Sequence, residues 1–193
     1  MKICIYGAAS PIISDEYKKS AFELGKMLAE KGHTLVFGGG KNGIMGECAR
    51  AFTSVGGEII GIVPKFFRET YAETLYDKCS KVVWCDTMYE RKQIMEELAE
   101  GFVIAPGGVG TYDEFFSVLT TKQLDRHRKP IAVFSPFGFY DGFTQVFDRA
   151  VREMFVPEGC MELFKRFEDA AALVEYIESD QAENYKPVNL KRG

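Results

Sequence analysis

The sequence predicts an α/β fold, a doubly wound and mostly parallel β-sheet with helices on both faces. Six short apolar runs of strand character alternate with segments of helical periodicity; the runs span 2–7, 33–38, 58–64, 81–85, 102–106 and 130–134. Alternation of this kind is typical of parallel strands joined by helical crossovers. Glycine-rich turns follow the first, second and fifth runs, at the edge where such a sheet binds its ligands.

Helix signals between the runs support this order. The segment 14–32 has acids in its first turn and apolar residues at helical spacing, at Ala21, Leu24, Met27 and Leu28. Gly32 closes this helix, and Gly56 and Gly101 are expected to close two further helices in the same way.

Length and charge bound the class of protein. A chain of 193 residues is typical of one domain, which we expect over residues 1–180, with a loosely held polar tail over 181–193. The net charge of −4, from 24 basic and 28 acidic residues, gives no field that would gather nucleic acid or an anionic membrane. Any anionic ligand must therefore be bound locally.

Cysteines and apolar runs bear on the compartment. Five cysteines without a CxxC pair predict neither a disulfide framework nor a zinc site, so a reducing interior is expected. The N-terminal apolar run is too short for a signal peptide, and no run of about 18 apolar residues is present. The sequence thus predicts a soluble, cytoplasmic protein.

The turn at 107–111, "GGVGT", is suited to binding a phosphate. A glycine turn that leads into a helix presents unpaired N–H groups and the positive end of the helix dipole. Gly107, Gly108 and Gly110 permit left-handed backbone and close approach, and Thr111 can cap the helix. Neither a Walker loop nor a dinucleotide fingerprint is present, which disfavours ATP chemistry and hydride transfer. The alternative is a tight turn that needs glycine for backbone reasons alone.

Charged residues are expected beside this turn. The segment 88–95, "MYERKQIM", opens the helix before the fifth strand, so its first turn starts from the same edge of the sheet. Arg91 or Lys92 could then reach a phosphate, although both could instead belong to a solvated helix face paired with Glu96. Glu114 has an alternative too, because acids are favoured in the first turn of any helix.

Two motifs carry a resemblance to a known family. "PGGVGTYDE" at 106–114 resembles the PGGxGTxxE motif, and "MYERKQIM" resembles the MHxRKxxM-like motif, of the LOG (Lonely Guy) family of cytokinin riboside 5′-monophosphate phosphoribohydrolases, often labelled "lysine decarboxylase". The resemblance extends to 37–46 and 120–134. It implies a Rossmann-like fold, a dimer or higher oligomer, and hydrolysis of a nucleoside 5′-monophosphate to free base and ribose 5-phosphate, with no cofactor or metal. AMP nucleosidase activity is a further expectation.

The resemblance also assigns residues. It implies that Arg91 and Glu114 are catalytic, and it places substrate contacts at Glu73, Lys92, Gly108, Val109, Gly110, Thr111, Thr120, Gly39 and Gly40. This chain departs from the family's pattern at Tyr89, in place of the usual His, and at Asp113, where Glu is common. These two departures bear on substrate preference more than on the chemistry. A third departure is the first turn, "GAASPIISDEY", which is less serine-rich than in the family and bears on a possible ribose or phosphate contact at Ser10.

The predicted reaction explains why an anion site and a carboxylate occur together. Cleavage of an N-glycosidic bond builds positive charge on the ribose, which Glu114 can stabilise while it orients or deprotonates water. The turn at 107–111 would anchor the 5′-phosphate, and Arg91 would orient the substrate. Two rivals remain: a pyridoxal phosphate decarboxylase, for which no site is seen, and a non-catalytic carrier of a phosphorylated cofactor such as a molybdopterin. A carrier would not need Glu114 with Arg91.

Overall fold

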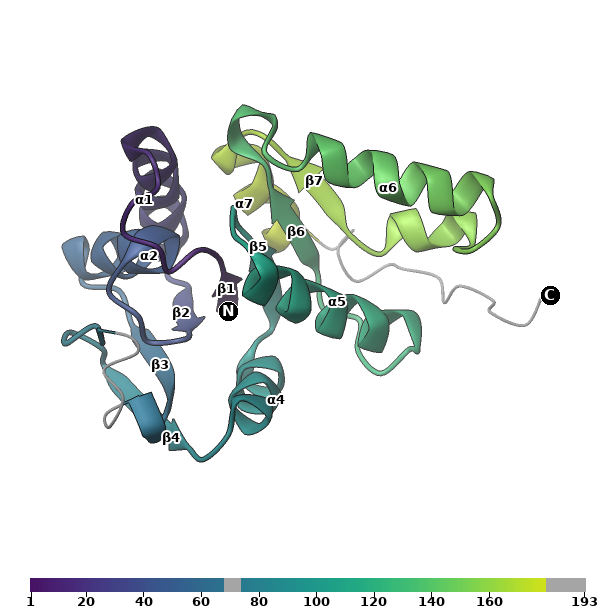
Figure 1. Ribbon diagram of the computed structural model, residues 1–193. Helices are drawn as coiled ribbons and strands as arrows, with labels where there is room; N and C mark the ends of the chain where they lie inside the picture. The colour runs from purple at the N-terminus through teal and green to yellow at the C-terminus, as the bar shows by residue number, and fades with distance from the viewer. Residues whose placement is uncertain (68–73, 180–193) are drawn as a thin grey trace.

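A seven-stranded parallel β-sheet forms the centre of the molecule (Figure 1). The computed structural model describes residues 1–67 and 74–179. The strands are β1 (Lys2–Tyr6), β2 (Thr34–Phe37), β3 (Ile59–Pro64), β4 (Lys81–Cys85), β5 (Gly101–Ile104), β6 (Ile131–Phe134) and β7 (Lys165–Phe167). Their order in the sheet is β4-β3-β2-β1-β5-β6-β7, and every neighbouring pair is parallel. The predicted fold class is confirmed.

Helices cover both faces of the sheet (Figure 1). They are α1 (Asp15–Glu30), α2 (Gly43–Ser54), α4 (Met88–Leu98), α5 (Val109–Gln123), α6 (Asp141–Arg152) and α7 (Ala170–Glu178), with short 3-10 turns η1 (Pro136–Gly138) and η2 (Glu158–Glu162). The helices α1, α2 and α7 pack in one core cluster, and α4, α5 and α6 pack in the other. Among the described residues, no helix is long and apolar enough to cross a membrane.

The central strand β1 explains why the sequence of a strand in this sheet is apolar at consecutive positions. Ile3 and Ile5 point into the core under α1, α2 and α7, whereas Cys4 and Tyr6 point into the core under α4, α5 and α6. All four side chains are buried. A strand covered on both faces needs apolar residues at every position, and not only at alternate ones.

Some local expectations are confirmed and others are wrong. Gly32 and Gly56 follow helices in a left-handed conformation, as expected, with φ of +76° and +74°. Gly101 does not end a helix: α4 ends at Leu98, and Gly101 is the buried first residue of β5. Met27, expected on the core face of α1, is 38% exposed. The sequence analysis also missed β7, a short edge strand whose residues Lys165–Phe167 lack an apolar pattern.

Candidate active site

A cavity of about 670 Å³ lies at the carboxyl edge of the sheet. It is lined by the turn after β1, the start of α2, the connection after β3, and the first two turns of α4 and α5. Its residues are Gly7, Ala8, Ala9, Pro11, Asn42, Met45, Phe67, Thr74, Met88, Tyr89, Arg91, Lys92, Gly108, Gly110, Thr111, Asp113 and Glu114. The strands β2, β3 and β4 extend the sheet on one side of β1, and β5, β6 and β7 extend it on the other side. Ligands of open α/β sheets bind at this kind of switch point.

Backbone hydrogen bonds tie the three glycine-rich turns together. The N–H of Ala8 donates to the carbonyl of Pro106 at 3.0 Å, and the N–H of Met45 donates to the carbonyl of Ala8 at 3.4 Å. The hydroxyl of Tyr140, which is buried, donates to the carbonyl of Ala105 at 2.8 Å. The turn after β1 therefore bridges the other two, and the cavity wall is a connected structure.

The N-terminus of α5 gives the cavity its site for an anion. The helix begins at Val109 after Gly108, which supplies no side-chain cap. The first N–H groups of a helix have no intrahelical acceptors, and the helix dipole adds partial positive charge there. Gly108 and Gly110 both line the cavity, and a Cβ on either would meet no atom within 4 Å. The two glycines thus leave space for a ligand close to these donors.

Two expectations about this turn are wrong. None of Gly107, Gly108 and Gly110 has a positive φ, so left-handed backbone is not the reason for glycine here. Thr111 does not cap the helix; it lies inside the first turn of α5 and is only 4% exposed. What the turn does require is close approach, because a Cβ on Gly107 would lie 2.1 Å from Oγ1 of Thr111.

Arg91 is held on the cavity wall by backbone carbonyls. Its Nη2 donates to the carbonyl of Gly38 at 2.8 Å, and its Nε donates to the carbonyl of Ile62 at 3.2 Å. The Phe67 ring centroid lies 5.6 Å from Cζ. Only 6% of Arg91 is exposed, so the solvated-face alternative does not hold for this residue. A guanidinium that is fixed before the ligand arrives loses little side-chain entropy on binding.

Lys92 pairs with α5 and not with its own helix. Its Nζ lies 3.0 Å and 2.9 Å from the two carboxylate oxygens of Asp113. The expected partner Glu96 instead accepts a hydrogen bond from Ser117 at 2.6 Å. Asp113 is one of the positions where this chain departs from the family's pattern, and here it holds Lys92 at the cavity.

Glu114 lines the cavity from the second turn of α5. The helix starts at Val109, and no acid lies in its first turn, so a general preference for acids at helix starts does not explain this residue. Glu114 is half-buried and lies near the end of β1. Burial raises the pKa of Tyr6 well above its usual value, and the negative charge of Glu114 adds to that rise.

Four other predicted contacts, among the residues that the structure describes, do not line the cavity. Val109 is 84% exposed, Thr120 is exposed, and neither lines the cavity. Gly39 and Gly40 also lie outside the lining, where they pair with the following loop: the carbonyl of Gly39 accepts from Tyr76 at 2.8 Å, and Gly40 forms a bridge with Leu75. Glu73 lies outside the described residues.

Sequence reasoning missed part of the lining. Asn42, Met45, Phe67 and Met88 face the cavity but were not predicted. Asn42 and Met45 lie in the run 37–46, so the resemblance contained a signal for them, whereas Phe67 lies in no matched motif. Within residues 1–67 and 74–179, no group of three or more His, Cys, Asp or Glu side chains is arranged to hold a metal ion.

The fold and the cavity together define an α/β protein with a ligand site at the switch point of its sheet. A family model described as "Possible lysine decarboxylase" matches residues 45–177. The cytokinin riboside 5′-monophosphate phosphoribohydrolase of Mycobacterium tuberculosis is 38% identical over 160 residues, covering 83% of this chain and 84% of the relative. The rice enzyme LOG is 36% identical over 179 residues, covering 92% and 72%. This chain belongs to the LOG family of cytokinin riboside 5′-monophosphate phosphoribohydrolases.

Solved structures share the fold at lower sequence identity. A molybdenum cofactor carrier protein from Chlamydomonas reinhardtii superimposes with a TM-score of 0.68 at 21% identity, covering 92% of this chain and 95% of the carrier. A molybdenum cofactor binding protein from Rippkaea orientalis gives a TM-score of 0.66 at 16% identity, covering 92% and 93%. At these identities the similarity concerns the fold, and function has to be argued from the site.

Proposed function

We propose that this chain hydrolyses the N-glycosidic bond of a cytokinin riboside 5′-monophosphate to free base and ribose 5-phosphate. One observation carries the proposal above the others. A chain 36–38% identical to enzymes named for this reaction brings Arg91, Glu114 and the start of α5 to the wall of one cavity. Adenosine 5′-monophosphate, which lacks only the N6 substituent, is proposed as a second substrate.

The 5′-phosphate is proposed to bind at the start of α5. The space left by Gly108 and Gly110 lets a phosphate approach the free N–H groups of the first turn. Charge-assisted hydrogen bonds of this kind contribute about 1.5–3 kcal/mol each. Anchoring the phosphate also restricts the ribose, since the two are linked through the 5′-ester oxygen and C5′, and so brings C1′ within reach of the catalytic groups.

Glu114 is proposed to act on the sugar and on the attacking water. Loss of the base leaves an electron-poor C1′, and a carboxylate beside it stabilises that charge. The same carboxylate accepts a proton from water as the oxygen bonds to C1′. The base departs with the electron pair of the C1′–N bond and takes up a proton, so that hydrolysis as a whole adds one water across that bond. Glu114 lies one turn along α5 from Gly110, so the phosphate site and the carboxylate are set on one rigid helix.

Arg91 and Lys92 are proposed to complete the binding site. Arg91 offers a planar guanidinium whose position is fixed by two carbonyls. Lys92 is held by Asp113 and adds positive charge at the same wall. Together they offset the charge of a bound monophosphate. Substrate contacts by Glu73, Val109, Thr120, Gly39 and Gly40 stay predictions.

The protein is also proposed to work as a homodimer in the cytoplasm. Apolar side chains are exposed on α5 and on and after α6, namely Phe116, Val146, Met154 and Phe155. Exposed apolar side chains gathered on one side favour an interface. The five cysteines are free, which agrees with a reducing compartment.

The decisive test is product analysis. The purified protein is incubated with N6-isopentenyladenosine 5′-monophosphate and with adenosine 5′-monophosphate, and free base and ribose 5-phosphate are quantified. Equal amounts of both products support hydrolysis. Tight nucleotide binding with no base released from either nucleotide would instead favour the carrier function named for the structural neighbours.

A further inference from the structure

Gly38 follows β2, and its missing side chain leaves room for the guanidinium of Arg91. A Cβ on Gly38 would lie 1.7 Å from Nη2, 2.7 Å from Cζ and 3.3 Å from Nε of Arg91. These are the three atoms nearest to that Cβ position, and all three belong to the guanidinium. Two of the distances are shorter than real Cβ contacts, so no other residue fits here while Arg91 keeps its place.

The backbone of Gly38 also binds the guanidinium of Arg91. Nη2 of Arg91 donates to the carbonyl of Gly38 at 2.8 Å, while Nε donates to the carbonyl of Ile62. The ring of Phe67 lies near the guanidinium carbon. We call Gly38, Ile62 and Phe67 the arginine socket. Two hydrogen bonds and a ring contact define both the position and the plane of the guanidinium.

Other glycines of the run 37–46 are explained by different neighbours. Gly39 has a φ of +84°, and its Cβ would lie 2.5 Å from a methyl group of Val63. A Cβ on Gly46 would lie 2.0 Å from the carbonyl oxygen of Lys41. These glycines meet backbone or core atoms and therefore serve the fold. Gly38 alone among the three meets a side chain that lines the cavity.

We propose that Gly38 is a positioning residue, which sets Arg91 in its catalytic place by leaving the arginine socket open. The inference rests on the proposed role of Arg91. It gives the first glycine of this run a task other than binding substrate, since Gly38 itself does not line the cavity. It also links the run 37–46 to the motif 88–95 through one physical contact, 53 residues apart in the chain.

The structure indicates that the side chain of Arg91, and not the backbone at Gly38, would move if Gly38 were replaced by alanine. Gly38 is not among the residues with positive φ, so alanine is compatible with its backbone. The clashing atoms form the far end of a flexible side chain, which can swing away at low cost to the fold. Gly38→Ala should therefore displace the guanidinium and leave the sheet intact. A displacement of about 1 Å at a catalytic group can cost roughly 10²-fold in rate.

A double-mutant cycle tests this directly. The wild type, Gly38→Ala, Arg91→Ala and the double variant are compared by kcat/KM on N6-isopentenyladenosine 5′-monophosphate and by melting temperature. Gly38→Ala should lower kcat/KM by roughly 10²-fold, with a melting temperature near that of the wild type. On the Arg91→Ala background the same change should have no further effect, because the group it displaces is absent. Gly142→Ala is the matched control, since a Cβ there meets nothing within 4 Å.

The outcomes separate the inference from the proposed function. Wild-type kinetics in Gly38→Ala, or the same fold loss on both backgrounds, would overturn the positioning role while leaving the hydrolase intact. If Gly38→Ala lowers the melting temperature of the wild type, it must not lower that of Arg91→Ala; the same decrease on both backgrounds contradicts the inference. If the wild type releases no base, the proposed function fails. The coupling between Gly38 and Arg91 is then measured by calorimetric titration of the four proteins with adenosine 5′-monophosphate: Gly38→Ala should weaken binding in the wild type and not in Arg91→Ala, and equal weakening on both backgrounds would overturn the inference.

Discussion

At the scale of single residues, Glu114 owes its place to the point at which α5 begins. Because the helix starts at Val109, Glu114 falls in the second turn and faces the cavity, one turn away from the glycines that leave space for a ligand. A carboxylate close to an anion site repels the bound anion, which weakens binding. In the proposed reaction, the positive charge that develops on the ribose attracts the same carboxylate in the transition state.

Glu114→Gln is expected to lower kcat by about 10²-fold or more, because the amide keeps the size of the side chain and removes its charge and basicity. Folding should be retained, since Glu114 is only half-buried and faces the cavity. Single-turnover base release and a thermal melt check the two statements. The exposed Glu175 on α7 provides a matched control as Glu175→Gln. Near-normal turnover in a folded Glu114→Gln protein would remove the residue from the mechanism.

Lys122 is a buried lysine that makes stability depend on pH. It is 1% exposed, its Nζ donates to the carbonyl of Lys129 at 2.9 Å, and burial lowers its pKa to about 8. In the unfolded chain the pKa of lysine is about 10.4. Between these values the unfolded state binds more protons, so this group makes the fold more stable as pH rises through that window.

The prediction compares the wild type with Lys122→Met, which has a similar length and no charge. From pH 7 to pH 9.5, the free energy of unfolding of the wild type should rise relative to the variant, by on the order of 1–2 kcal/mol. Urea unfolding at several pH values gives this difference directly. A difference that stays constant over the range would show that Lys122 titrates near its usual pKa in the folded protein.

At the scale of secondary-structure elements, the start of α5 separates glycines that serve the fold from glycines that serve a ligand. A Cβ on Gly107 would lie 2.1 Å from Oγ1 and 2.7 Å from Cβ of the buried Thr111. A Cβ on Gly110 would project into open space at the cavity. The same substitution should therefore have two different effects within four residues.

Gly107→Ala is expected to lower the free energy of unfolding by about 1–3 kcal/mol, as overpacking of a buried site does. Gly110→Ala should keep or raise stability, because alanine is the better helix former, and should weaken nucleotide binding by about tenfold or more through crowding of the phosphate. Thermal melts and calorimetric titration with adenosine 5′-monophosphate measure both. Equal effects of the two variants on stability and on binding would contradict this division.

The limits of sequence reasoning are clearest for such elements. The strands β1, β2, β3, β5 and β6 were predictable because burial on both faces imposes unbroken apolar runs. The edge strand β4 is only partly buried, and it was predictable because its sequence, KVVWC, is rich in residues that favour strands. The edge strand β7 was not, since its residues Lys165–Phe167 carry two charges in three positions. Thr111 was expected to be able to cap α5, whereas the helix begins two residues earlier, at Val109, without a side-chain cap. A helix start that binds a ligand gains from leaving its N–H groups uncapped.

The candidate site shows the same limit. Arg91, Lys92, Glu114 and Gly108 were predicted by motif and do line one cavity. Gly38 escaped prediction, because its contact depends on where the guanidinium of a residue 53 positions later comes to lie. Such long-range contacts are set by topology, and no local pattern in the sequence records them.

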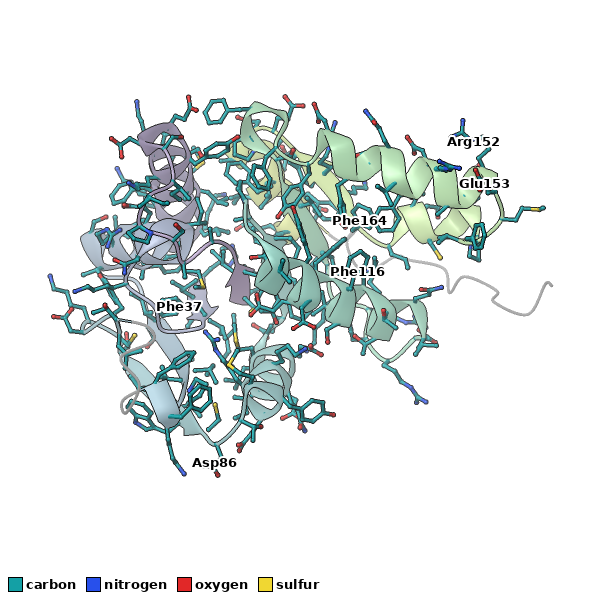
Figure 2. The ribbon with its side chains drawn as sticks, viewed as in Figure 1. Phe37, Asp86, Phe116, Arg152, Glu153 and Phe164 are labelled. Atoms are coloured by element: carbon teal, nitrogen blue, oxygen red, sulfur yellow. The ribbon has the colours of Figure 1, made fainter. Side chains whose placement is uncertain are left out.

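At the scale of the whole molecule, α5 and α6 form the side on which a partner is expected. Most apolar residues of α5 do not contribute to this side, since Phe115, Val118 and Leu119 are buried within the chain, at 2%, 0% and 6% exposure. Phe116 remains 43% exposed; it is labelled in Figure 2, and its ring stacks on Phe147 of α6. Further exposed apolar residues follow in and after α6, among them Phe155 at 81%.

Light scattering should give a mass of about twice 21.7 kDa, or a higher even multiple, at micromolar concentration. Phe155→Glu should shift the protein towards the monomer, because a charge would have to be buried in an apolar interface. Met27→Glu is the matched control, since Met27 is exposed on α1, on the other face of the sheet. A wild-type monomer, or a Phe155→Glu protein with unchanged mass, would contradict an interface on this side.

The central claim is that one cavity binds the 5′-phosphate at the start of α5 while Glu114 acts on the glycosidic bond. The most direct test is the ratio of kcat/KM for N6-isopentenyladenosine 5′-monophosphate to that for the nucleoside without the phosphate. Loss of two charge-assisted hydrogen bonds, at about 1.5–3 kcal/mol each, predicts a ratio of roughly 10² or more. Equal rates on nucleotide and nucleoside would show that the glycines before α5 form only a turn, and the account of this site would be wrong.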